Sequence, residues 1–167
     1  AIMNPKNTIN LVKRFMGRKF DDPEVIEAKK HIQYDIVNHN GWAYIQIDGK
    51  EYSPQQISSW ILAELKKMAE DYTGETITDA VITVPANFDS VMCKATRAAA
   101  SLAGIKVLNS DGSERPVLLS EPNAVIYDLI NQVQNGEISN HIIDLNSEKF
   151  VMVFDLGGGT LDITMHR

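Results

Sequence analysis

The chain has 167 residues, of which 44% are hydrophobic and 23% charged, and its formal net charge is -6. This is the composition of an ordinary globular protein, long enough for one domain or two small lobes. The negative charge argues against surfaces for nucleic acid or anionic membranes, and no apolar run approaches the roughly 18 residues of a membrane span. The only cysteine, Cys93, excludes an intrachain disulfide.

The first 75 residues are predicted to form an α/β lobe without a catalytic constellation. Capping and helical spacing predict one helix from Thr8 to Gly17 and a second from Pro23 to about His31. Period-two patterns then predict strands at residues 34–37, 42–47 and 50–52.

A long third helix is predicted to begin at the capping box Ser53-Pro54-Gln55-Gln56 and to end at Gly74. Its apolar residues recur at helical spacing, so we expect them to face the core rather than a cofactor. They are Ile57, Trp60, Ile61, Leu65, Met68, Ala69 and Tyr72.

From Asp79 onward the predicted elements alternate between strand and helix. Strands are expected at 80–84, 105–108, 117–120 and 150–154, and helices from Asp89 or Ser90 to Gly104 and from Glu121 to Ile130. Such alternation gives a parallel or mixed sheet covered by helices. We expect residues 81–84, 117–120 and 150–155 to share one sheet, separate from the sheet of the first lobe.

The most informative stretch is Asp155-Leu156-Gly157-Gly158-Gly159-Thr160-Leu161-Asp162, which lies between an apolar strand and an alternating one. Without Cβ atoms, the glycine backbone can offer closely spaced N–H groups to an anion, and Thr160 adds a hydroxyl for a phosphate. Asp155 and Asp162 provide the one or two carboxylates that suit a hydrated Mg²⁺. The alternative is a glycine-rich hairpin turn with exposed acids, but the flanking residues favour phosphate and metal binding.

Glu121 and Pro85 also follow predicted strands. Ligands of α/β sheets bind at the carboxyl ends of strands, so Asp155, Glu121 and Pro85 are expected to converge on one cleft. Glu121 either points into that cleft to hold a water or hydrated metal, or stabilises the start of a helix. The four histidines lack metal-ligand spacing, and Cys93 is predicted to be a packed thiol.

Four further stretches accompany the glycine loop, and together they resemble the seventy-kilodalton heat-shock chaperone family in its own order. They are Met3-Asn4-Pro5-Lys6-Asn7-Thr8, Lys13-Arg14-Phe15-Met16-Gly17-Arg18-Lys19-Phe20-Asp21-Asp22, Val81-Ile82-Thr83-Val84-Pro85-Ala86 and Glu121-Pro122-Asn123-Ala124. The resemblance spans nearly the whole chain and is more specific than the glycine loop alone.

This resemblance implies a partial α/β domain of the actin-like ATPase (ribonuclease H-like) fold, into which a smaller α/β lobe is inserted. Residues 1–75 would be the outer lobe and residues 76–148 the inner lobe, with loops at 109–116 and 132–149. Residues 149–167 would begin the second half with a phosphate-binding hairpin. Because the chain starts without an initiator Met and stops just after a strand, we expect it to be a piece of a longer protein.

By similarity, the chain would bind ATP or ADP with Mg²⁺, and the full-length chaperone would hydrolyse ATP to control a separate peptide-binding domain. Gly157, Gly158, Gly159 and Thr160 would contact the phosphates. Glu121, Asp155 and Asp162 would be catalytic, with Asp155 and Glu121 holding the metal, the latter through water, and Pro85 would act as a conformational switch. The chain alone is expected to be inactive.

The same resemblance implies unfolded polypeptide clients, J-domain co-chaperones and nucleotide-exchange factors as partners, with neither nucleic acid nor membrane among them. A cytoplasmic location is expected, with an organellar lumen as the alternative. Cys93 and Asn87 replace an Arg and a Tyr that are usual in the family, which indicates a divergent member. Two other functions stay open, a non-hydrolysing co-chaperone relative and another actin-like ATPase.

Overall fold

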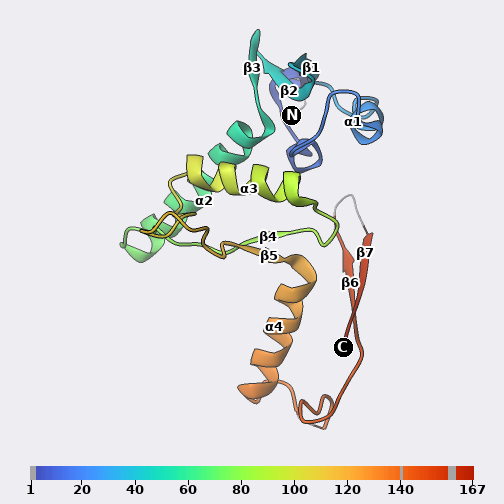
Figure 1. Ribbon diagram of the computed structural model, residues 1–167, viewed down its shortest axis with the longest axis vertical. Coiled ribbons are helices and arrows are strands. Elements are labelled where there is room, and N and C mark those ends of the chain that lie inside the picture. The colour runs from blue at the N-terminus through green and yellow to red at the C-terminus, as the bar shows by residue number, and fades with distance from the viewer. Residues whose placement is uncertain (1–2, 140, 158–160) are drawn as a thin grey trace. The chain divides into compact units, whose positions relative to one another are not determined.

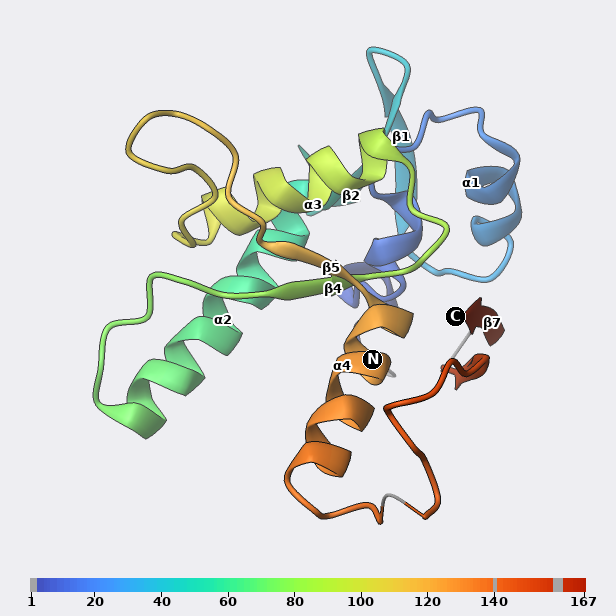
Figure 2. The ribbon, with the colours of Figure 1, turned by 60° about the horizontal axis from the view of Figure 1, so that its bottom comes forward.

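The computed structural model describes residues 3–139, 141–157 and 161–167. The chain forms two compact units, of which unit 1 comprises Ala1–Ala80 and Asp89–Val117, and unit 2 comprises Val81–Phe88 and Leu118–Arg167. Figures 1 and 2 show the elements of both units, which are mixed α/β with small sheets. Within the described residues, none of the helices combines the length and the apolarity that a bilayer span requires.

The sheet of unit 1 is an antiparallel meander of three strands, β1 (Asp35–His39), β2 (Trp42–Ile47) and β3 (Lys50–Tyr52). Its two turns, Asn40-Gly41 and Asp48-Gly49, place both residues at positive φ, as the twist of a two-residue hairpin loop requires. The three strands predicted from period-two patterns are therefore confirmed, with β1 shifted by one or two residues.

The core of unit 1 lies against one face of this sheet. It brings together Phe15 from a short 3₁₀ helix, Val25 and Ala28 from the short helix Pro23–Ala28, and Ile57 from the first turn of α2 (Pro54–Thr73). Phe15 and Tyr34 meet edge to face, with ring centroids 6.5 Å apart. The buried residues of this cluster are Phe15, Val25, Ala28, Tyr34, Ile36, Ala43, Ile45 and Ile57.

The predicted helix from Thr8 to Gly17 is wrong. The segment instead contains the short 3₁₀ helices η1 (Pro5–Asn7) and η2 (Val12–Phe15), and Leu11 between them has a left-handed backbone with φ 55°. A left-handed residue cannot continue a right-handed helix. The Thr8 hydroxyl donates a hydrogen bond to the Asn4 carbonyl at 2.7 Å instead of capping a helix. The second helix, α1, is short and spans Pro23–Ala28.

Helix α2 begins and ends as predicted. Ser53 and Gln56 form the reciprocal capping box, and Gly74 ends the helix with φ 72°. The apolar stripe, however, does not face a core, since Trp60, Ile61, Leu65 and Met68 are 50–60% exposed and Tyr72 is 92% exposed. Only Ile57 of this stripe is buried, in the core of unit 1, whereas Leu62, outside the stripe, packs against the second cluster of Met16, Ala95 and Ala99.

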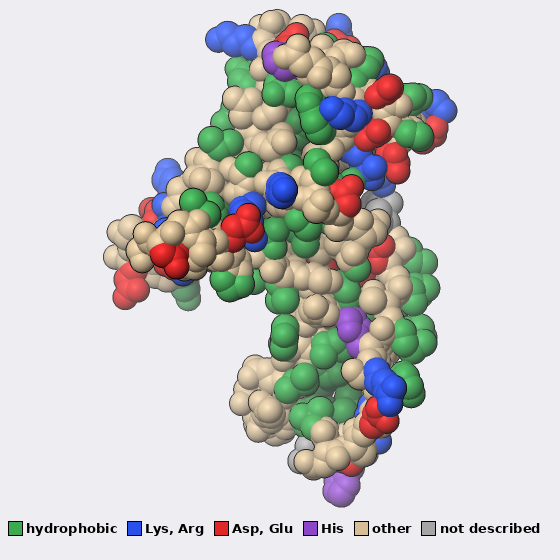
Figure 3. Space-filling view, in the orientation of Figure 1, with side chains coloured by type: hydrophobic (Ala, Val, Ile, Leu, Met, Phe, Trp, Pro, Cys, Tyr) green, Lys and Arg blue, Asp and Glu red, His purple; other side chains and the backbone are tan. Residues whose placement is uncertain are grey.

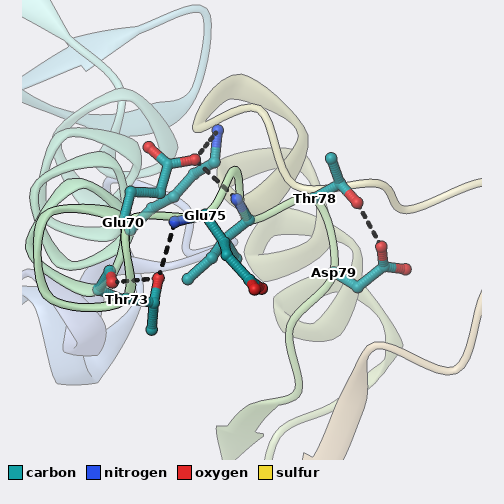
Figure 4. A network of polar contacts seen from close by, with 8 residues as sticks. Glu70, Thr73, Glu75, Thr78 and Asp79 are labelled. Atoms are coloured by element: carbon teal, nitrogen blue, oxygen red, sulfur yellow. Dashed lines mark hydrogen bonds and ion pairs between the residues drawn. The ribbon is translucent and has the colours of Figure 1, made fainter.

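A polar network fixes the chain where it leaves α2 (Figure 4). A carboxylate oxygen of Glu70 accepts the Ile77 backbone N–H at 2.9 Å and lies 3.6 Å from the Lys66 ammonium. The Thr73 hydroxyl accepts the Glu75 N–H at 3.3 Å. These bonds replace the helical partners that backbone groups lose after Thr73.

A second network ties the end of the predicted loop 109–116 to the rest of unit 1. Arg97 donates to the Arg115 carbonyl at 2.6 Å, and Arg115 forms an ion pair with Asp79. The Thr78 hydroxyl, with a smaller effect from Arg115, lowers the pKa of Asp79. The strand predicted at 105–108 is absent, because the backbone bonds of these residues go to separate partners (Ala100, Thr78 and Arg115) and Leu108 makes an isolated bridge.

Helix α3 (Ser90–Leu102) completes unit 1. Asp89 is its N-cap and accepts the N–H groups of Val91 and Met92 at 2.8 and 2.9 Å, as predicted. The buried face carries Met92, Ala95, Thr96, Ala99 and Ala100, whereas Leu102 at the end of the helix is 62% exposed.

Unit 2 contains a parallel pair, β4 (Ile82–Val84) and β5 (Leu118–Ser120), followed by α4 (Glu121–Gln134). Figure 2 shows β4 and β5 side by side. The strands β6 (Val151–Leu156) and β7 (Leu161–His166) form a separate antiparallel hairpin. Within the described residues β6 pairs only with β7, so the prediction that it shares a sheet with β4 and β5 is wrong. Helix α4 contacts β4, β5 and β6, and links the two pairs through packing instead.

We expect Gly17→Ala to destabilise the fold by at least about 2 kcal/mol, because Gly17 has φ +66° and an added Cβ would lie 3.1 Å from the backbone of Val91 and Met92. Gly49→Ala is the matched control, since Gly49 has φ +76° but no atom within 4 Å of the added Cβ. Its cost should stay near about 1 kcal/mol. Urea denaturation measures both, and equal costs would contradict a packing role for Gly17.

A pH dependence follows from Tyr34, which is 4% exposed and donates its hydroxyl proton to the Asn10 carbonyl. Burial raises the pKa of Tyr34 from 10.0 to about 12. A raised folded-state pKa gives a contribution that is complete below the unfolded value and is lost as the pH rises through the folded one. Between about pH 10 and about pH 12, the chain should therefore lose about 2 kcal/mol more stability than Tyr34→Phe. Parallel pH profiles of the two proteins in urea denaturation would contradict this assignment.

Candidate functional site

The two predicted aspartates are brought together by the β6–β7 hairpin. Asp155 and Asp162 are cross-strand partners, the last pair but one before the turn, so their side chains leave the same face of the hairpin. Directly opposite residues have Cβ atoms about 5 Å apart, and like charges at such positions destabilise a sheet. Both side chains are half-buried. This arrangement is favourable only with a cation or positive group nearby, so the carboxylate pair fits a divalent metal ion.

The two faces of the hairpin differ in chemistry. The face that carries the aspartates also carries Val153, which is buried, and Thr164 and His166, which are half-buried. The opposite face is apolar and exposed, and Figure 3 shows green side chains gathered along the outer side of β6 and β7. Its residues are Met152, Phe154, Leu156, Leu161, Ile163 and Met165, which are 50–74% exposed.

The turn between the two strands is only partly described. Gly157 follows β6 directly and is exposed. Gly158, Gly159 and Thr160 lie outside the described residues. The predicted phosphate contacts of all four residues therefore remain a prediction. The register nevertheless puts this turn one residue pair beyond the two aspartates, since Leu156 pairs with Leu161.

Glu121 and Pro85 occupy matching positions at the ends of β4 and β5. Val84 pairs with Ser120 in the parallel register, so Pro85 and Glu121 are the next residues on two neighbouring strands. Pro85 starts a turn in which its carbonyl accepts the Phe88 N–H at 3.1 Å. Ser120, not Glu121, is the N-cap of α4, and Glu121 is the first helical residue, half-buried and followed by Pro122. A carboxylate at this position is favourable toward the helix dipole, and it lies at a sheet edge where ligands bind.

Pro85, Glu121 and Asp155 were predicted to lie at neighbouring strand ends. Pro85 and Glu121 do so, because β4 and β5 pair in one sheet. Asp155 belongs to the other sheet of unit 2, which α4 contacts through β6. Among the described residues, no group of three or more His, Cys, Asp or Glu side chains lies close enough to enclose a metal ion. A closed cage is not what Mg²⁺ needs, because it binds through one or two carboxylates, phosphate oxygens and several waters.

Thr164 and His166 share the face of the two aspartates and were not predicted as site residues. Their alternation with exposed apolar residues in Leu161–His166 was the available signal, since a period of two assigns Asp162, Thr164 and His166 to one face. The His166 Nε2 atom is buried without a hydrogen-bond partner among the described residues. His166 pairs with Val151 at the open end of the hairpin, away from the turn. Cys93, on α3 of unit 1, is half-buried.

A family model described as Hsp70 protein matches residues 1–167, which is the whole chain. Proteins of this family are ATP-binding heat-shock chaperones whose ATPase domain has the actin-like fold, and the mixed α/β units with small sheets are consistent with part of that domain. The predicted family and fold class are confirmed. The chain therefore belongs to the Hsp70 family.

Proposed function

We propose that this chain forms part of an ATP-hydrolysing domain in which the β6–β7 hairpin binds the phosphates and the metal, and that the whole protein couples ATP turnover to peptide binding in a separate domain. The observation that carries the proposal is the cross-strand pair of Asp155 and Asp162 beside the glycine turn. A purely structural hairpin would gain stability from replacing either carboxylate with a neutral or positive residue. Retaining both is explained by a positively charged ligand.

The proposed roles follow from the position of each side chain. Mg²⁺, when bound, neutralises charge on the phosphate oxygens of ATP. Asp155 and Asp162 hold and orient its hydration shell from one face of the hairpin. Backbone N–H groups of residues 157–160 bind phosphate oxygens, and the Thr160 hydroxyl adds one hydrogen bond. These residues position the reactants without forming a covalent bond to them.

Glu121 is proposed to hold a water at the ends of β4 and β5, where it can accept a proton as the water attacks the γ-phosphate. Pro85, at the end of the adjacent strand, is proposed as the switch that senses this step. The parallel register supports a link between Pro85 and Glu121. The two residues follow directly on neighbouring strands, so a movement of Pro85 can be transmitted to Glu121. Client polypeptides, J-domain co-chaperones, exchange factors and a cytoplasmic location are part of the same proposal and rest on family membership.

A non-hydrolysing relative that promotes nucleotide exchange on a partner is the second candidate. The observations that favour it are Cys93 and Asn87, which replace the usual Arg and Tyr of the family. Both substitutions bear on coupling to the peptide-binding domain more than on the carboxylates of unit 2. Steady ATP turnover by the complete protein would exclude this candidate.

In a protein that contains the complete domain, Asp155→Asn and Asp162→Asn should each lower ATPase turnover at least about a hundredfold, because each removes a charge that orients the metal. Each variant should also need a higher Mg²⁺ concentration for half-maximal activity. Asp128→Asn is the matched control, since Asp128 is an exposed carboxylate of α4 in the same unit. If all three variants keep the ATPase turnover of the unmodified protein and its circular dichroism spectrum, the proposed metal site is ruled out.

The 167-residue chain by itself should bind Mg-ATP only weakly, with a dissociation constant in the millimolar range, or about -4 kcal/mol. A tight site holds phosphate and metal from both sides in a closed cleft, and an exposed site is wet, so that each charge interaction is several-fold weaker. Isothermal titration calorimetry measures the constant directly. A micromolar value would mean that the residues proposed here are not the principal binding groups.

A further inference from the structure

Unit 1 contains a pocket that the proposed function does not use. Its volume is about 460 Å³, within the range of small-molecule sites. It lies among η2, β2, the N-terminal turn of α2 and one face of α3, all parts of unit 1. None of the residues proposed to bind nucleotide or metal lines it.

The walls of the pocket combine a flat aromatic surface with positive charge. Trp42 and Tyr44 project from β2, and Arg18 and Lys94 are its cationic side chains. Among the described lining residues there is no aspartate or glutamate, although the chain as a whole carries a net charge of -6. A locally positive cavity in an acidic protein attracts anions and retains them where the walls exclude water.

Arg18 has hydrogen-bonding capacity left over. One terminal nitrogen, Nη1, lies 3.4 Å from a Glu24 carboxylate oxygen, and the side chain is 26% exposed. Among the described residues its Nε–H is buried without a hydrogen-bond partner. Buried polar atoms without partners are rare in native proteins and are explained where a ligand or an ion completes them.

One face of the Trp42 ring is covered by a lysine, so a flat ligand can stack only on the other face. The Lys19 ammonium lies over its ring, 3.4 Å from the centroid, and adds a third positive charge beside the pocket. This contact holds the indole in place, so a second planar group can stack on it with little loss of side-chain freedom.

We propose that this pocket binds a small planar organic anion, with a carboxylate directed at Arg18 and Lys94 and an aromatic body against Trp42 and Tyr44. Arg18 suits a carboxylate because its guanidinium is planar and always charged. Lys94, which is exposed on α3, contributes a point charge at the rim of the pocket. The site rests on the geometry of unit 1 and is independent of ATP hydrolysis.

The test uses sodium 2-naphthoate as the anionic probe and 2-naphthamide as its neutral counterpart, titrated into the ¹⁵N-labelled chain. The two tryptophan indole N–H signals report separately, since Trp42 lines the pocket and Trp60, 50% exposed on α2, does not. Naphthoate should shift the Trp42 signal in a saturable way and bind more tightly than the amide. Raising the salt concentration should weaken the naphthoate and leave the amide unchanged.

Charge-removing variants assign the anion to its cations. Arg18→Gln should weaken naphthoate binding about tenfold, as expected for a charge-assisted hydrogen bond, and Lys94→Gln about threefold. Lys67→Gln, an exposed α2 lysine outside the pocket, is the matched control and should leave the constant unchanged. If Arg18→Gln fails to fold, the Lys94→Gln variant tests the proposal alone. The Lys94 side chain is exposed, so its replacement should not affect folding.

Three results would each overturn the proposal. The first is equal affinity for naphthoate and naphthamide, which would mean that charge is not recognised. The second is a shift of Trp60 without Trp42, which would place the probe on the exposed apolar surface of α2. The third is an affinity that Lys94→Gln and Lys67→Gln change to the same extent.

Discussion

The in-register parallel pairing of β4 and β5 is the constraint on which the chemistry of unit 2 depends. It aligns Val84 with Ser120, and so the residues that leave the sheet next are a proline that starts a turn and a glutamate that starts a helix. Proline supplies no N–H, and therefore the edge beside Glu121 lacks one backbone donor. Pro85 and Glu121 therefore leave the same edge of the parallel pair, where ligands of α/β sheets bind.

The sequence predicted local structure well wherever the chain itself dictates a conformation. The hairpin turns of unit 1 depend on residues that adopt positive φ, and the Ser53 and Asp89 caps depend on side-chain to backbone bonds within a few residues. The strands β6 and β7 are neighbours in the chain and pair through their backbones. The helix predicted from Thr8 failed for a complementary reason. Its apolar spacing was helical, but Leu11 adopts a left-handed backbone so that Phe15 can enter the core.

A periodic pattern predicts an apolar face but not which other element packs against that face. Trp60, Leu65 and Met68 have helical spacing, yet they are 50–60% exposed, although the Trp60 ring meets the Tyr52 ring edge to face. The strand Val151–Leu156 was predicted correctly, but its assignment to the sheet of β4 and β5 was not. Sheet membership is decided by long-range pairing, which a single sequence does not encode in its spacing. The candidate carboxylates were found from the sequence, whereas the facing of Asp155 and Asp162 required the register.

The apolar face of the β6–β7 hairpin has a consequence for the behaviour of this chain in solution. Its side chains are those of an aggregation-prone segment, and within the described residues the free edges of both strands are unpaired. Besides the aspartate pair on the opposite face, the hairpin carries charge at its open end, where Arg167 pairs with Glu148 and lies 5.9 Å from the ring centroid of Phe150. Such flanking charges oppose strand addition near the open end but leave the apolar face uncovered. We therefore expect self-association through this face to limit the concentration at which the isolated chain stays monodisperse.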